Sequence, residues 1–234
     1  MGLFRNNFSE NVKLKICGVT RTEDILRCYQ LGVDAVGFLV SNPNNEYPTD
    51  KLHPYEAKSL INIVPSTMSS VLLVKHRIQL DEIVELVEET MPNVLQIQEE
   101  SVTPKNMKLL RDRYKNIEII RTTHLKSEDT FDSIKKKIEP YLDVADAILL
   151  DSAKGGSGKK HNWEVSVKVV EFLKTKKIAS VLAGGLHLYN VEEAIKQAKP
   201  DMVDIMSGAR LEVPVRGVLN IQKVKGLTDL INRR

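Results

Sequence analysis

The feature that most constrains the fold of this 234-residue chain is an alternation of short apolar stretches and amphipathic stretches, repeated about eight times. Strands are predicted at residues 12–17, 34–40, 70–75, 93–97 and 117–122, and around Ile148, Val181 and Val203. Helices are predicted at residues 20–31, 54–64, 80–87, 104–114, 129–142, 163–174, 191–198 and 219–230. Several strands are continuous apolar runs, which is typical of parallel strands covered on both faces. Alternation of this kind indicates parallel strands joined by helical crossovers.

About eight such units favour a single (β/α)8 barrel over an open, doubly wound sheet. We expect residues 1–234 to form one barrel domain, with residues 1–11 as an N-terminal extension. In such barrels the reactive residues follow the strands, on the carboxyl-end face. Side chains at the ends of the predicted strands are therefore the candidates for chemistry.

Composition excludes several classes of function. Lys plus Arg is 34 and Asp plus Glu is 31, a balance that predicts no nucleic-acid partner. No apolar run is long enough to cross a bilayer, and the first residues lack the apolar core of a signal peptide. The two cysteines form no disulfide framework. These features predict a cytoplasmic protein with no membrane partner.

Two strand ends carry side chains suited to proton transfer. Cys17 ends the first strand and precedes Gly18, so its thiol is either a base or nucleophile at the barrel mouth or a small buried hydrophobe. Cys28, on a helix face, is predicted to be the second kind. Asp151 ends a very apolar strand, where it either caps the following loop or acts as a general acid with a raised pKa.

Glycines after the late strands indicate an anion site. The loop 155–158 does not fit a P-loop, because residue 153 is Ala and residue 160 is Lys. The pairs Gly184-Gly185 and Ser207-Gly208 follow the last two strands, where barrels commonly bind phosphate. The five histidines lack a spacing that dictates metal ligation, so no metal is predicted. His76 and His124 follow predicted strands, which leaves open a meeting near the barrel mouth, but surface or loop positions are expected for them.

Together these motifs resemble the phosphoribosylanthranilate isomerase family, the small barrel enzymes of tryptophan biosynthesis. The similarity runs from about residue 12 to residue 230. The family-like pieces, in order, are Lys15-Ile16-Cys17-Gly18, Leu149-Leu150-Asp151-Ser152 with Gly155-Gly156-Ser157-Gly158, Leu182-Ala183-Gly184-Gly185-Leu186, and Val203-Asp204-Ile205 with Ser207-Gly208.

The resemblance implies an Amadori rearrangement of a small phosphorylated sugar amine, N-(5'-phosphoribosyl)anthranilate, with no cofactor or metal. Asp151 would be the general acid that opens the furanose ring, and Cys17 the general base that removes the proton from C2. The substrate phosphate would rest on Gly156, Gly184, Gly185, Ser207 and Gly208. The protein would be a monomer or a homodimer.

The chain departs from the family pattern around the aromatic half of the substrate. The family's Ser-Pro-Arg motif is replaced within residues 41–48, which contain no arginine, and Gln-Leu-His-Gly is replaced by Gln96-Ile97-Gln98-Glu99. At the last strand, Ser-Ser-Gly-Val-Glu becomes 206–210, Met-Ser-Gly-Ala-Arg. Arg121 or Lys75 is a candidate for the missing positive charge, and Gln96 for a further substrate contact. Two alternatives stay open: a related isomerase acting on a different phosphoribosyl amine, and a barrel that binds a phosphoribosyl ligand without turnover.

Overall fold

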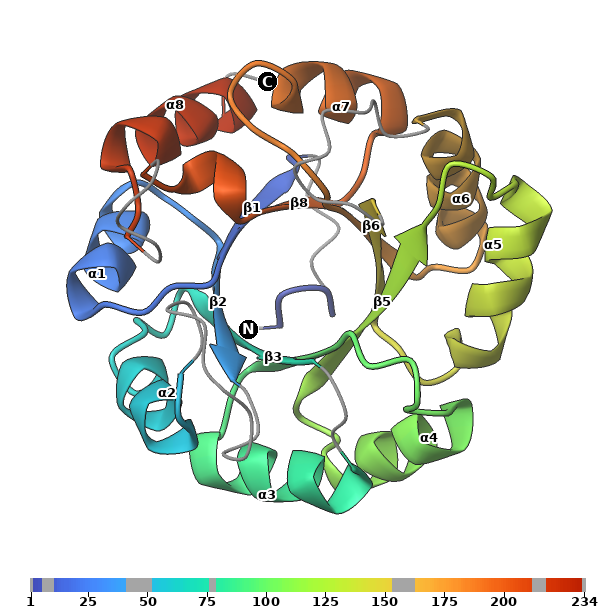
Figure 1. Cartoon of the computed structure of the whole chain (residues 1–234), viewed down its shortest axis with the longest axis horizontal. Coiled ribbons are helices and arrows are strands. Elements are labelled where there is room, and N and C mark those ends of the chain that lie inside the picture. The colour runs from blue at the N-terminus through green and yellow to red at the C-terminus, as the bar shows by residue number, and fades with distance from the viewer. Residues whose placement is uncertain are drawn as a thin grey trace.

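The computed structural model describes residues 2–5, 11–40, 52–75, 79–152, 163–211 and 218–232. Its strands form a closed parallel barrel in which each strand pairs with the next and β8 returns to β1 (Figure 1). The strands are β1 (Lys13–Cys17), β2 (Ala35–Val40), β3 (Ser69–Val74), β4 (Val94–Ile97), β5 (Glu118–Leu125), β6 (Ala147–Ser152), β7 (Ala179–Leu182) and β8 (Met202–Ile205). The predicted (β/α)8 barrel is confirmed.

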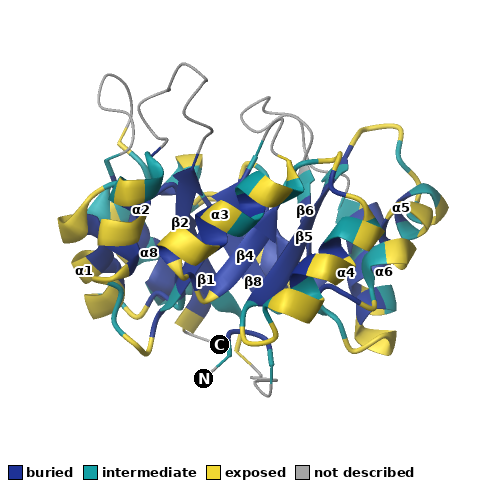
Figure 2. Cartoon of the chain, turned by 90° about the horizontal axis from the view of Figure 1, so that it is seen from below, coloured by how far each residue is buried: buried dark blue, intermediate teal, exposed yellow. Residues whose placement is uncertain are grey.

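The helices surround the barrel, and their outer faces are exposed (Figure 2). They are α1 (Thr22–Gln30), α2 (Pro54–Ile61), α3 (Leu80–Thr90), α4 (Pro104–Arg113), α5 (Phe131–Ile138), α6 (Trp163–Thr175), α7 (Val191–Ala198) and α8 (Ile221–Asn232), with short 3-10 helices η1 (Glu139–Tyr141) and η2 (Ser207–Ala209). None of the helices in the described part of the chain is long and apolar enough to span a membrane.

Strand side chains alternate between two environments because successive residues point to opposite faces. On β1, Leu14 and Ile16 belong to the large apolar core between strands and helices. Lys13, Lys15 and Cys17 therefore point into the barrel. The lower interior is a separate apolar cluster of small and branched residues, among them Ala35, Val71, Ile120, Leu149 and Val181.

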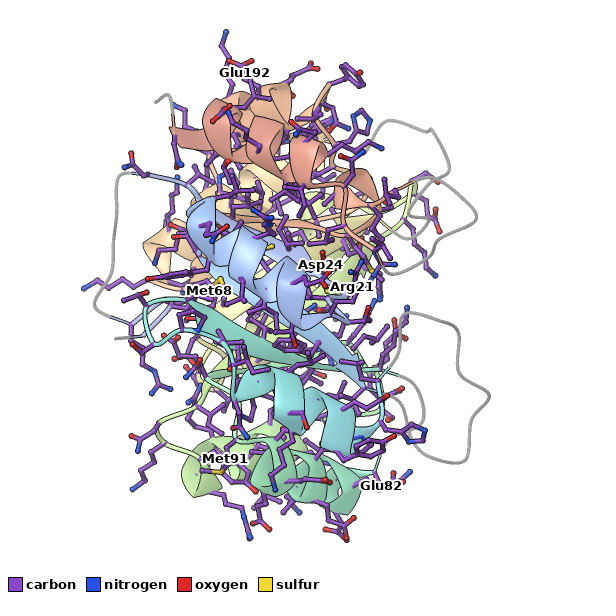
Figure 3. The ribbon with its side chains drawn as sticks, turned by 90° about the vertical axis from the view of Figure 1, so that its left-hand side faces the viewer. Arg21, Asp24, Met68, Glu82, Met91 and Glu192 are labelled. Carbon is purple, nitrogen blue, oxygen red and sulfur yellow. The ribbon has the colours of Figure 1, made fainter. Side chains whose placement is uncertain are left out.

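The start of α1 differs from the prediction. A capping box at residues 20–23 would start the helix after Thr20, but α1 begins at Thr22 and its N-cap, Arg21, makes no side-chain cap hydrogen bond. Figure 3 shows Arg21 and Asp24 at this end of the helix. Asp24 is buried and accepts a hydrogen bond from the backbone of Leu219, which links α1 to the segment before α8. The first turn of α1 is therefore tied to a distant segment of the chain.

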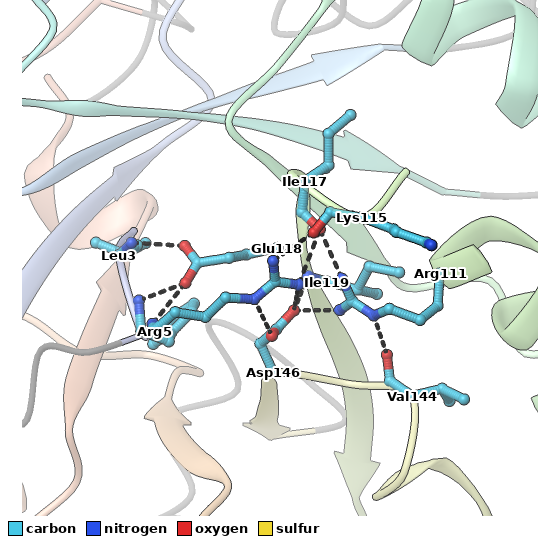
Figure 4. Close-up of polar contacts among 10 residues, drawn as sticks. Leu3, Arg5, Arg111, Lys115, Ile117, Glu118, Ile119, Val144 and Asp146 are labelled. Carbon is cyan, nitrogen blue, oxygen red and sulfur yellow. Dashed lines mark hydrogen bonds and ion pairs between the residues drawn. The ribbon is translucent and has the colours of Figure 1, made fainter. Parts of the chain in front are cut away.

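Residues 2–5 form a plug in the floor of the barrel (Figures 1 and 4). Leu3 and Phe4 are buried in the lower apolar cluster. The carboxylate of Glu118 on β5 accepts hydrogen bonds from the backbone N–H groups of residues 3, 4 and 5, at 2.5, 2.9 and 2.7 Å. The Arg5 guanidinium donates to Asp146, which also pairs with Arg111. The predicted N-terminal extension therefore includes residues that pack inside the barrel.

Candidate active site

The mouth of the barrel is built on β1 by two inward side chains, Lys15 and Cys17. Cys17 is buried with only 4% of its surface exposed, and Lys15 is fully buried. Gly37 on β2 lies directly beside Cys17 in the strand register. A Cβ atom at Gly37 would lie 3.0 Å from Cys17 Sγ and 3.1 Å from Lys15 Cε. The glycine therefore leaves the space that both side chains occupy.

Lys15 forms a buried ion pair across the seam that closes the barrel. Its Nζ lies 2.7 Å from Oδ2 of Asp204 on β8, and the two residues are register partners. The second carboxylate oxygen of Asp204, Oδ1, is buried and has no hydrogen-bond partner among the described residues. A buried acceptor without a partner is costly in a protein interior, so this oxygen indicates a place where a ligand can donate a hydrogen bond.

Asp151 stands on β6, near the end of its strand as predicted. His124 on β5 is its register partner, with Nδ1 3.9 Å from Asp151 Oδ2. The pKa of the Asp151 carboxyl is raised to about 6: burial is the largest cause, the negative charge of Asp204 acts in the same direction, and the charges of Lys75 and Lys15 oppose both effects. Asp151 therefore holds a proton at a pH at which exposed carboxyls have lost theirs, as a general acid requires.

The thiol of Cys17 must lose its proton to act as a base, whereas Asp151 must hold one. Burial raises its pKa, Lys15 opposes this effect by its charge and by a hydrogen bond, Asp204 adds to the increase, and Arg210 opposes it. Arg210 lies close by, because its Nη2 donates to the carbonyl of Gly18 at 2.9 Å. Cationic neighbours thus favour the thiolate at a site where burial disfavours it.

The two predicted glycine loops come together at the carboxyl end of β7 and β8. Gly184 and Gly185 have φ values of +90° and +66°, which side chains rarely adopt. A Cβ atom at Gly208 would lie 2.0 Å from the carbonyl oxygen of Leu186, so this glycine permits the loops to touch. Ser207 begins η2 beside them. Gly156, the other predicted phosphate contact, lies outside the described residues.

Of the three further candidate contacts, Arg121 faces away from the barrel interior, whereas Lys75 and Gln96 face into it. Arg121 is not brought to the mouth: its guanidinium lies 4.7 Å from the centre of the Tyr141 ring, and Nη1 donates to the carbonyl of Glu99 at 2.6 Å. Its neighbour Thr122 faces the interior, where its Oγ1 accepts from Gln96 Nε2 at 3.3 Å, so Arg121 faces the helices. The hypothesis that Arg121 supplies the missing charge is corrected accordingly.

Lys75 and Gln96 do face the interior. Lys75 follows β3, and its charge acts on Asp151. Gln96 is buried, and its Oε1 has no hydrogen-bond partner in the described part of the chain. Both residues remain candidates for substrate contacts.

Several residues at the mouth were missed from the sequence. Lys15 and Asp204 sit inside predicted strands, and the signal for Lys15 was its two-residue spacing from Cys17, which puts both on one face of a strand. His124, expected at the surface, faces Asp151 instead. His76 lies outside the described residues.

Cys28 lies in the core, on the helix face where it was expected. Cys28 is fully buried on α1, and burial raises the pKa of its thiol to about 12, so it is the small core residue that was predicted. Across residues 2–5, 11–40, 52–75, 79–152, 163–211 and 218–232, no group of three or more His, Cys, Asp or Glu side chains could hold a metal ion.

Fold and site together define a (β/α)8 barrel with a buried thiol and a proton-holding carboxyl at its carboxyl-end face. The family model described as N-(5'-phosphoribosyl)anthranilate (PRA) isomerase matches residues 14–229. The isomerase of that name from Methanocella arvoryzae is 32% identical over 203 residues, 86% of this chain and 90% of the relative. That from Bacillus cereus is 31% identical over 222 residues, 92% and 95% of the two chains. The chain belongs to the N-(5'-phosphoribosyl)anthranilate isomerase family.

Solved structures agree on the fold. The phosphoribosylanthranilate isomerase of Thermotoga maritima superposes with a TM-score of 0.76 at 24% identity, covering 95% of this chain and 100% of the other. The enzyme from Thermococcus kodakaraensis gives a TM-score of 0.76 at 25% identity over the same shares.

Proposed function

We propose that this chain catalyses the Amadori rearrangement of N-(5'-phosphoribosyl)anthranilate to 1-(2-carboxyphenylamino)-1-deoxyribulose 5-phosphate, the isomerase step of tryptophan biosynthesis. The observation that carries the proposal is the placement of an acid and a base in one barrel mouth. Asp151 holds its proton to about pH 6, and Cys17 lies beside two cationic groups. Both groups respond to the same charge, Asp204.

The chemistry needs these two groups and no electron acceptor. The Asp151 carboxyl donates its proton to the furanose ring oxygen as the C1–O bond breaks, and the nitrogen lone pair forms an iminium at C1. The Cys17 thiolate then removes the proton from C2, and the electron pair moves through C1 to neutralise the nitrogen. The resulting enolamine gains a proton at C1 and loses the proton of its C2 hydroxyl to solvent, which gives the ketone. The first two proton transfers are made by positioned side chains.

The phosphate and the anthranilate carboxylate need separate recognition. Backbone N–H groups of the loops at Gly184-Gly185 and Ser207-Gly208 are suited to the phosphate, and Gly156 is a further proposed contact. We assign the carboxylate to Lys75, because it is the candidate cation that acts electrostatically on Asp151. Gln96 is proposed as a polar contact through its unpartnered Oε1.

Two broader predictions accompany this activity. Both cysteines are free and buried, a state that a reducing compartment favours, which supports a cytoplasmic location. A monomer or a homodimer is proposed; a related structure contains monomers generated from the dimeric isomerase of Thermotoga maritima. Sedimentation analysis decides between the two states.

The test is turnover of the substrate, made in place from anthranilate and phosphoribosyl pyrophosphate by a transferase and followed by fluorescence. We expect turnover by the wild type and by Cys28→Ala, and at least a hundredfold loss of kcat in Cys17→Ser. Near-normal turnover by Cys17→Ser would refute the base. A well-folded wild type without turnover would refute anthranilate as the amine, and other phosphoribosyl amines would then be screened.

A further inference from the structure

We propose that Lys15 is a positioning residue for the base: its ammonium group, anchored by Asp204, favours the thiolate form of Cys17 in the barrel mouth. The inference deepens the proposed function, because it rests on Cys17 acting as the base. It adds Lys15 and Asp204 to the residues on which the proton transfer depends.

The strand geometry places the ammonium and the thiol together. Lys15 and Cys17 are two residues apart on β1, so both side chains enter the barrel on the same face. Both side chains pack against Gly37, because a Cβ atom added there would lie 3.0 Å from Cys17 Sγ and 3.1 Å from Lys15 Cε. The ammonium follows directly after Cε, and it donates a hydrogen bond to the thiol as well as pairing with Asp204 at 2.7 Å.

Stability does not explain this ion pair. Replacing a buried pair by apolar residues is often neutral or stabilising, so a fully buried lysine needs another reason. The Arg111–Asp146 pair in the floor shows what a structural pair does here. Arg111 also donates to the carbonyls of Val144 and Ile117, and Asp146 accepts from the backbone of Ile119 (Figure 4). In contrast, Asp204 leaves Oδ1 buried and unpartnered.

The charged groups around Cys17 act on its ionisation in opposite directions. Lys15 on the same strand and Arg210 beyond η2 favour the thiolate, while Asp204 on β8 disfavours it. Asp151 on β6 responds to Lys15 and Asp204 too, and to Lys75. Removing Lys15 should therefore make the thiol harder to ionise, and removing Asp204 should make it easier. A role limited to packing gives no reason for opposite effects.

The experiment titrates Cys17 directly, in a Cys28→Ala background that leaves it as the lone cysteine. The rate of alkylation by iodoacetamide is measured by mass spectrometry from pH 6 to 10. Lys15→Met should react at least tenfold more slowly at pH 8, with its midpoint shifted upward. Asp204→Asn should react faster than its parent at the same pH. Arg111→Met, the matched control in the floor, should keep the parental midpoint.

Turnover is measured in parallel, where Lys15→Met should lose at least tenfold in kcat with little change in KM. If Lys15→Met does not fold, the neutral double variant Lys15→Met with Asp204→Asn takes its place and should still show a raised midpoint. Unmoved midpoints, or midpoints that move in the same direction in both single variants, overturn the proposal. Loss of wild-type turnover with shifted midpoints would instead overturn the function and leave the role of Lys15 standing.

Discussion

Asp151→Asn should stabilise the folded protein at neutral pH while removing the proton donor. A carboxyl whose pKa is higher in the folded than in the unfolded state destabilises the fold once it ionises. The pKa of Asp151 rises from 3.8 to about 6 on folding. Below pH 3.8 both states are protonated and there is no cost. The cost grows between pH 3.8 and 6 and is complete above pH 6.

The magnitude follows from the same two values. One pKa unit corresponds to about 1.4 kcal/mol, so the full cost is about 3 kcal/mol at pH 7.5 and about 1 kcal/mol at pH 4.5. The side chain is 27% exposed, and solvent screening makes these values upper bounds. Asparagine has nearly the same shape and no charge, so the variant should recover most of this free energy.

The assay is urea unfolding of both proteins at pH 4.5 and pH 7.5, combined with turnover. We expect Asp151→Asn to be the more stable protein, with a larger difference at pH 7.5, and to lose at least a hundredfold in kcat. Asp112→Asn, at an exposed helix position, should show little change at either pH. A variant less stable than the wild type at pH 7.5, or a difference that is the same at both pH values, would refute the proposed environment of Asp151.

Three further predictions concern the loops, the floor and the substrate carboxylate. Gly208→Ala forces the touching loops apart, so inhibition by inorganic phosphate should weaken about tenfold. Glu118→Gln weakens the hydrogen bonds to residues 3–5, and urea unfolding should show a loss of about 1–3 kcal/mol with kcat unchanged. Lys75→Met should raise KM about tenfold, whereas the exposed control Lys108→Met should leave KM unaltered; equal KM values would remove Lys75 from the carboxylate site.

The barrel was predictable because alternation of apolar strands and amphipathic helices survives in any single sequence, and the ends of strands can be located well enough to select Cys17 and Asp151. The face of a strand is harder to predict. Residues 117–122 were expected to form the fifth strand, but β5 continues to Leu125. Its polar end, Thr122 to His124, looks like a loop because the barrel mouth is itself polar. Because Arg121 was taken for the end of the strand, it was expected at the mouth, whereas β5 turns its side chain toward the helices.

Lys15 and Asp204 could not be paired from the sequence for a different reason. They are 189 residues apart and meet only because the last strand closes on the first. The predicted barrel implies that closure, but nothing in the local patterns sets the register that makes these two residues partners.

The plug in the floor sets an order on assembly during synthesis. Residues 3–5 are synthesised before their partners Glu118 and Asp146, which lie more than a hundred positions later in the chain. Residues 3–5 therefore cannot form these contacts until β5 and Asp146, the residue directly before β6, have been made. The plug therefore packs into the floor only after more than half of the barrel strands have been synthesised.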